Sequence, residues 1–174
     1  MTRLFPKYYH TLSVFELHGC LVSGRMIRFQ GCTPACAESF NLRLQKTPDT
    51  YDCDIAVNLE FRFDDSILIM NHKEDGKWGE EKTCECLPFR PGQKLEVLLL
   101  CDMKGYNVAL NGKHFCEYEH HSTYRNIRYV LAEDEVILTN IAVMDNPSSY
   151  RKMFRCRRRK KSEEKEQSKS KSDC

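Results

Sequence analysis

The chain has 174 residues, of which 41% are hydrophobic and 10% aromatic, enough for one domain with a buried core plus an appendage. No stretch approaches the roughly 20 apolar residues of a membrane-spanning helix, and residues 1–13 lack the apolar run of a signal peptide. We therefore expect a leaderless, soluble and cytoplasmic protein without a membrane span. Nuclear location and leaderless secretion stay open as alternatives.

The net charge of +2 hides an asymmetry along the chain. Residues 151–174 contain eleven basic and four acidic side chains, which leaves sixteen basic and twenty-one acidic side chains in residues 1–150. The body is mildly acidic and the tail strongly basic, so an argument for nucleic-acid binding from bulk charge applies to the tail alone.

Short apolar or alternating runs, rich in Val, Ile, Leu, Phe and Tyr, follow one another along the body and are typical of β-strands. In chain order they are Leu12–Leu17, Arg25–Gln30, Ser39–Gln45, Asp54–Phe63, Ser66–His72, Lys94–Cys101, Tyr106–Leu110, His114–Tyr118, Arg128–Ala132 and Val136–Met144. Turn residues separate them, and Asn111-Gly112 predicts a two-residue type I′ hairpin because both residues tolerate positive φ.

Many short strands without a three-turn helix indicate an all-β fold, an antiparallel two-sheet sandwich over residues 12–146. Residues 147–174 change abruptly to charge and serine, and we expect them to form a disordered basic tail. Besides a solvated end, the run Arg157–Lys161 indicates a nuclear-localisation signal or a segment that contacts anionic surfaces.

Strict alternation of apolar and polar residues marks the strand Asp54–Phe63 as half-buried. Its inward residues are predicted to be Leu59, Phe61 and Phe63, and its outward residues Asn58, Glu60 and Arg62. Farther along come Asn71 and Trp78-Gly79-Glu80-Glu81, where the single tryptophan stands among glycines and charges. An exposed aromatic ring beside a fan of planar polar groups is what recognition of a pyranose requires.

On these residues the sequence resembles a galectin carbohydrate-recognition domain, from about Val14 to Asp145. The resemblance is carried by the order and spacing of several segments: Gly24–Gly31, Ala37–Leu44, Asp54–Phe63, Asn71 with Trp78–Glu81, Pro88–Gln93 and Tyr106–Phe115. It implies a six- and a five-stranded sheet, jelly-roll-like, with a sugar groove on one outer face. It also implies a non-catalytic lectin without a cofactor whose partners are glycans or glycoproteins, β-galactosides foremost.

Carried over residue by residue, the resemblance is mixed. Arg62, Asn71, Trp78 and Glu81 match positions that contact or brace galactose in the family. Asn58 stands where the family has histidine, Glu60 where it has asparagine, Phe61 where it has proline and Thr83 where a second arginine is usual. The predicted carbohydrate-binding residues are Asn58, Glu60, Arg62, Asn71, Trp78 and Glu81.

Our hypothesis from these differences is that Glu60 and Glu81 both pair with Arg62 and leave fewer donors for sugar. Altered glycan specificity is equally compatible. The alternative function is a galectin fold with a degenerate sugar site that acts as an intracellular protein-interaction module. A homodimer is a further expectation from the family.

Other chemistry finds little support in the sequence. No GxSxG, HExxH or Gly-rich phosphate loop is present, so we expect neither catalytic residues nor an enzyme. We also expect no metal site: Cys32-x3-Cys36 and Cys84-x-Cys86 lack paired zinc spacing, and the ten cysteines are interpreted as reduced thiols. We interpret His114, His120 and His121 as surface polar residues.

Overall fold

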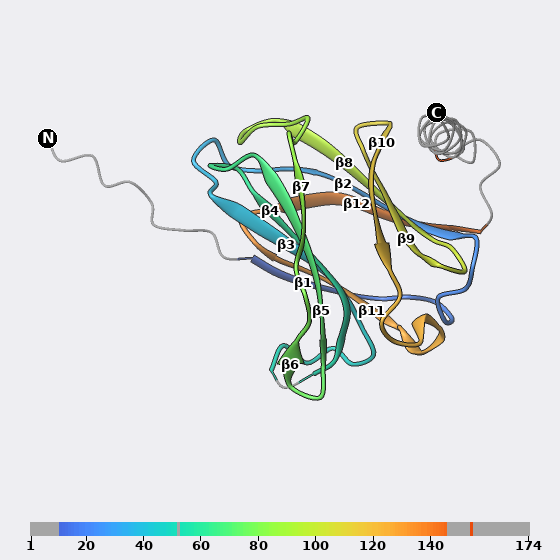
Figure 1. The fold of residues 1–174 in the computed structure, drawn as a ribbon. Helices are drawn as coiled ribbons and strands as arrows, with labels where there is room; N and C mark the ends of the chain where they lie inside the picture. Colours follow the sequence, from blue (N-terminus) through green and yellow to red (C-terminus); the bar gives the residue numbers. More distant parts are fainter. Residues whose placement is uncertain (1–10, 52, 146–153, 155–174) are drawn as a thin grey trace, which may run out of the picture.

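The computed structural model describes residues 11–51, 53–145 and 154, and its strands form two antiparallel sheets packed face to face (Figure 1). The first sheet consists, in spatial order, of β1 (Thr11–Glu16), β11 (Tyr129–Asp134), β3 (Ser39–Gln45), β4 (Ile55–Arg62) and β5 (Ile67–Glu74), with β6 (Lys77–Trp78) and β7 (Lys82–Glu85) both paired to β5. The second consists of β10 (Lys113–Glu119), β9 (Gly105–Leu110), β8 (Lys94–Cys101), β2 (Arg25–Cys32) and β12 (Ile137–Asp145). The predicted antiparallel sandwich is confirmed.

Each of the ten predicted runs corresponds to a strand, with ends that differ by one or two residues. The sequence did not predict β6 and β7, because these strands are short, mostly exposed and show no apolar alternation. They occupy successive stretches of one edge of β5, so the resemblance's six-stranded sheet is a seven-stranded sheet whose last strand is broken in two.

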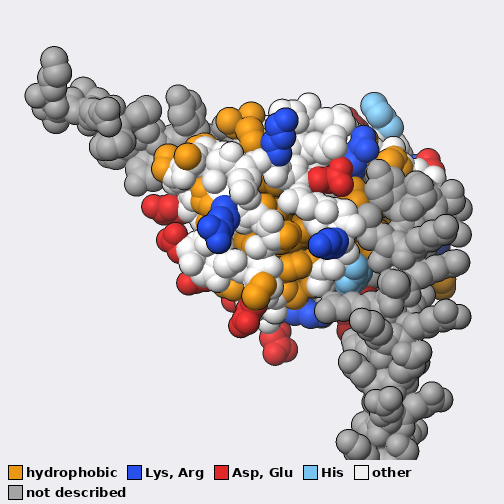
Figure 2. Space-filling model, turned by 90° about the horizontal axis from the view of Figure 1, so that it is seen from above, with side chains coloured by type: hydrophobic (Ala, Val, Ile, Leu, Met, Phe, Trp, Pro, Cys, Tyr) orange, Lys and Arg blue, Asp and Glu red, His pale blue; other side chains and the backbone are white. Residues whose placement is uncertain are grey.

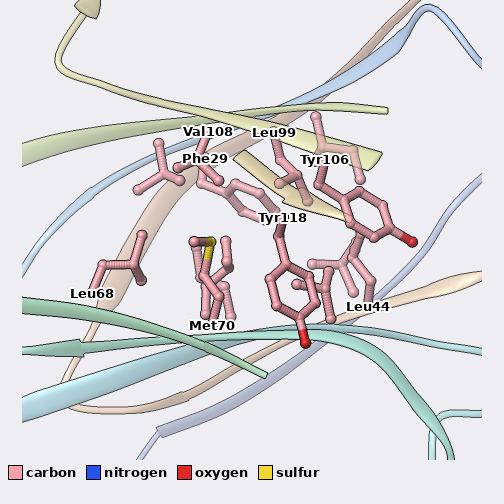
Figure 3. Close-up of a cluster of buried hydrophobic side chains, with 14 of the residues drawn as sticks. Phe29, Leu44, Leu68, Met70, Leu99, Tyr106, Val108 and Tyr118 are labelled. Atoms are coloured by element: carbon pink, nitrogen blue, oxygen red, sulfur yellow. The ribbon is translucent and has the colours of Figure 1, made fainter. Parts of the chain in front are cut away.

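The core lies between the sheets and is filled from both sides (Figure 3). Phe29, Leu99 and Val108 come from the five-stranded sheet, and Leu68 and Met70 face them from β5. On β4 the inward residues Leu59 and Phe61 are buried and Phe63 is half-buried, as the alternation predicted. The other face of β4 is therefore free to carry a site.

The turn between β9 and β10 has the predicted hairpin geometry. Asn111 has φ of 45° and Gly112 has φ of 79°, and positive φ at both central residues defines the type I′ turn. The register on either side pairs Lys113 with Leu110.

Cysteines in the described part of the chain are free thiols. Cys101 and Cys116 are buried in the core, as expected for small apolar residues, and burial raises the pKa of Cys101 to about 12. Among the described residues no helix has the length and apolar character needed to cross a bilayer. The predicted disordered tail lies outside the described residues, except for Phe154, which is buried.

Candidate carbohydrate-binding site

Strand register gathers the predicted site residues on the outer face of the seven-stranded sheet. Asn58 of β4 lies opposite Asn71 of β5, and Arg62 lies opposite Ile67. Residues two apart along a strand share a face, so Asn58, Glu60 and Arg62 form a polar row beside Asn71. Continuing outward, β6 adds Trp78, and Glu81 directly precedes β7.

Trp78 presents an aromatic surface at one end of this row. It lies opposite Lys73 in the β5–β6 pairing, two residues beyond Asn71 and thus on the same face. Its side chain is 50% exposed. A half-exposed indole next to polar side chains offers the apolar face of a sugar ring a stacking partner.

Arg62 makes its ion pair with Glu60 of the same strand. Arg62 Nε and Glu60 Oε1 are 2.6 Å apart, and the arginine side chain is 45% exposed. The hydrogen bond and charge of Glu60 raise the pKa of the Arg62 guanidinium, with smaller contributions from the charges of Glu81 and Asp65. The expected pairing with Glu60 is therefore present, whereas Glu81 acts on Arg62 through its charge and not through a described hydrogen bond.

Asn58 is more enclosed than its outward position suggests. Only 6% of it is exposed. Its Oδ1 accepts a hydrogen bond from Arg43 Nε at 3.2 Å, and its Nδ2 donates to Asn41 Oδ1 at 3.3 Å. Both polar atoms of this side chain are thus already engaged by β3.

The β3 partners of Asn58 are themselves held by carboxylates of β11. Arg43 forms an ion pair with Glu133 at 2.9 Å, and Asn41 Nδ2 donates to Asp134 Oδ2 at 2.7 Å. Burial raises the pKa of Glu133, Arg43 partly offsets this, and Asp134 adds to it. A continuous polar network therefore links β11, β3 and β4 across the face.

Asn71 and the residues around it fix the local backbone. Asn71 is 5% exposed, and its Oδ1 accepts the His72 backbone N–H at 2.8 Å. His72 stacks on His121 with ring centroids 3.9 Å apart, and its Nδ1 lies 2.8 Å from the Tyr118 hydroxyl. A Cβ on Gly79 would overlap the His72 ring. Glycine beside Trp78 therefore allows the backbone at position 79 to lie close to this ring.

The interpretation of the three other histidines as surface residues holds for His121 alone, which is exposed. It is wrong for His114, whose side chain is 7% exposed. His120 is half-buried: its Nε2 lies 2.7 Å from the Asp102 carbonyl oxygen, and its ring packs on Tyr106. Packing by residues distant in sequence buries these rings, and local polarity does not reveal it.

We expect His72 to titrate below the ordinary histidine pKa of about 6.5. Burial lowers the pKa of His72, His121 lowers it further, and Glu74 partly offsets both. Because the folded state then binds fewer protons than the unfolded state, this group lowers stability as the pH falls below about 6.5. An NMR titration of the His72 ring resonances measures the midpoint.

In that titration the variant His121→Ala should move the His72 midpoint upward, whereas His18→Asn, on an exposed loop, should leave it unchanged. A His72 midpoint at or above 6.5 in the unmodified protein contradicts this account of the stacked pair.

The structure thus brings Asn58, Glu60, Arg62, Asn71, Trp78 and Glu81 to one face of adjoining strands. It also adds Asn41, Arg43 and Glu133, which the sequence reasoning did not select. Apolar and polar residues alternate in Asn41–Gln45 as they do in β4, but no sequence signal linked β3 to β11. Ile69, 5% exposed between Asn71 and Ile67, forms an apolar floor.

The arrangement suits noncovalent recognition. It offers a flat ring, guanidinium donors and carboxylate acceptors, the groups that bind a polyol. Within the described residues no three His, Cys, Asp or Glu side chains are grouped so as to hold a metal ion.

Comparisons with known proteins identify the family of the chain. Residues 13–143 match the family model described as galactoside-binding lectin. Galectin-7 of Rattus norvegicus is 28% identical over 120 residues, which cover 69% of this chain and 88% of galectin-7. Galectin-8 of the same organism is 32% identical over 106 residues, covering 60% of this chain and 33% of that protein.

Solved structures show the same fold. A double variant of human galectin-16 superposes with a TM-score of 0.69 at 19% identity, covering 83% of this chain and 99% of its own. Sheep galectin-11 in complex with glycerol gives a TM-score of 0.61 at 22% identity, covering 81% of this chain and 100% of its own.

Proposed function

Because the chain belongs to the family of galactoside-binding lectins, we propose that it binds glycans noncovalently on the outer face of the seven-stranded sheet. The observation that carries the proposal is the half-exposed Trp78 beside the polar row of Asn58, Glu60, Arg62 and Asn71. In this proposal Trp78 stacks on a sugar ring, and Arg62 and Glu81 bind its hydroxyls. The relatives are galectins, which are lectins and not enzymes.

The charges on this face support a preference for uncharged glycans. Both arginines of the face already have carboxylate partners, Arg43 with Glu133 and Arg62 with Glu60. Glu81 and Asp65 add negative charge near Arg62. A sulfate or carboxylate on the glycan would be repelled by these carboxylates and would compete with them for the guanidiniums. Neutral galactosides therefore fit the site better than sulfated or sialylated ones.

The variant Glu60→Gln is expected to bind neutral galactosides more tightly, by about twofold to tenfold or about 0.5–1.5 kcal/mol. Removing the carboxylate charge weakens its hold on Arg62 and leaves guanidinium donors available to the sugar. A glycan array carrying neutral, sialylated and sulfated galactosides, followed by titration with lactose, measures both affinity and preference.

Glu119→Gln, an exposed change on the other sheet, is the matched control and should leave binding unchanged. Stronger binding of sulfated than of neutral galactosides by the unmodified protein would overturn the proposed preference. Binding to no glycan by the protein or the variant would overturn the lectin proposal itself.

One observation favours the alternative, a protein-interaction module with a degenerate sugar site. The amide of Asn58 and the guanidiniums of Arg43 and Arg62 are all engaged by neighbouring side chains. Such a face has fewer free donors than a sugar site needs. A sugar-independent partner captured by both the protein and its Trp78→Ala variant would favour this alternative.

Assembly and location are also proposals. A homodimer would find exposed apolar side chains on one edge strand of each sheet, Leu12 and Val14 of β1 and Ile137 and Val143 of β12. We propose a cytoplasmic protein, with nuclear entry or secretion as alternatives. For the basic tail we propose contacts with anionic surfaces or a nuclear-localisation signal.

A further inference from the structure

A second buried apolar cluster lies on the outer side of the five-stranded sheet, away from the sandwich core. Met26 of β2, Leu98 of β8 and Ala109 of β9 are each 0% exposed. Their chain neighbours Ile27, Leu99 and Val108 point into the core, so alternation directs the cluster to the opposite face. Residues on an outward face are buried only where something covers them.

Phe154 covers this cluster. It is 8% exposed and packs with Met26, Leu98 and Ala109, while Leu100 and Met144 are half-buried at the margin. Its ring lies edge-to-face with that of His114, with centroids 5.7 Å apart and an interplanar angle of 83°. Edge-to-face contacts between rings at this distance are favourable.

The side of the molecule that carries this sheet is seen from above in Figure 2. Hydrophobic side chains show there between basic and acidic ones. Apolar outer-face residues on a sheet of this kind invite association when they are uncovered.

We propose that the outer face of β2, β8 and β9 is a docking site for the chain's own C-terminal segment, anchored by Phe154. Docking covers the apolar cluster and holds Phe154 against the sheet opposite the candidate sugar site. This inference does not depend on the proposed function.

The position of Phe154 in the sequence allows it to cover the cluster of its own chain. β12 belongs to the same sheet, and its Met144 lies opposite Met26 in the register. Eight residues separate Asp145 from Phe154, and a fully extended segment of this length reaches up to about 30 Å. Phe154 of the same chain therefore reaches the cluster without the help of a second copy.

In the 174-residue chain, Phe154→Ala is expected to lower the melting temperature by about 4–8 °C, because it removes an aromatic ring that packs against a buried cluster. Binding of an apolar dye should rise because the cluster becomes accessible. The matched control is Tyr51→Ala, a truncation at a side chain 89% exposed, which should shift the melting temperature by less than about 2 °C.

A double-variant cycle makes the test specific to the contact. Leu98→Ala should lower the melting temperature less in the Phe154→Ala background than in the unmodified protein, because the two side chains no longer interact. Sedimentation should show that Phe154→Ala does not dissociate any oligomer. Unchanged melting temperature and dye binding, or strictly additive effects, would overturn the docking site; a dimer that Phe154→Ala dissociates would overturn docking within one chain.

Discussion

Phe61→Ala is expected to lower the free energy of unfolding by about 3–5 kcal/mol. Phe61 is 0% exposed and stacks on Phe40 with ring centroids 4.4 Å apart and an interplanar angle of 10°, and Phe89 packs at 5.8 Å. Removing the Phe61 ring leaves a cavity beside Phe40, between the paired strands β3 and β4. Domains of this size are stable by only about 5–15 kcal/mol, so this loss is a large part of the total stability. It is the largest effect on stability that we predict for a single residue.

Denaturant unfolding followed by circular dichroism measures that loss. Phe61→Leu is the matched variant: it keeps most of the apolar volume and should cost clearly less than alanine. An unfolding midpoint of Phe61→Ala equal to that of the unmodified protein would contradict the assignment of Phe61 to the inner face of β4, and with it the outward orientation of Glu60 and Arg62.

Arg62→Ala is expected to weaken binding of neutral galactosides by about tenfold to 150-fold, the effect of losing hydrogen bonds to a charged donor worth about 1.5–3 kcal/mol. Arg62 is 45% exposed at the polar row, and its one described ion pair is with Glu60. Stability should change little, because exposed ion pairs contribute about 0–1 kcal/mol. Retention on immobilised lactose and the melting temperature separate the two effects.

Arg90→Ala removes an exposed arginine from the loop between β7 and β8 and serves as the control for charge. It should leave retention unchanged. Equal retention of Arg62→Ala and Arg90→Ala on lactose would show that Arg62 takes no part in sugar binding.

The alternation in Asp54–Phe63 was sufficient to predict the orientation of β4, because a strand with one buried face must alternate. The same rule failed for β6 and β7: all of their residues except the half-buried Cys84 are exposed, and both strands are held by pairing with β5. Trp78 was predicted as a site residue from the family spacing between Asn71 and Trp78, and the strand that carries it was not predicted.

The residues of the site could be predicted from the sequence, but the hydrogen bonds and ion pairs between them could not. Nothing in the sequence indicates that Asn58 is held by Arg43 and Asn41, since that depends on the register between β3 and β4. Arg43 in turn meets Glu133 because β11 pairs with β3. Phe154 was likewise placed in a tail expected to be disordered, whereas in the structure it is buried against outer-face residues of strands distant in sequence.

The proposed glycan binding depends most on Trp78, whose indole is expected to stack on a sugar ring. Titration of the 174-residue chain with lactose, followed by tryptophan emission, reports on this side chain alone because the chain has a single tryptophan. We predict a saturable change in intensity and a shift of the emission to shorter wavelength as the sugar covers the half-exposed indole, with no such change on adding sucrose at the same concentration. An emission spectrum that stays constant for lactose and for every other galactoside, in a protein that remains folded by circular dichroism, would contradict glycan binding at this face.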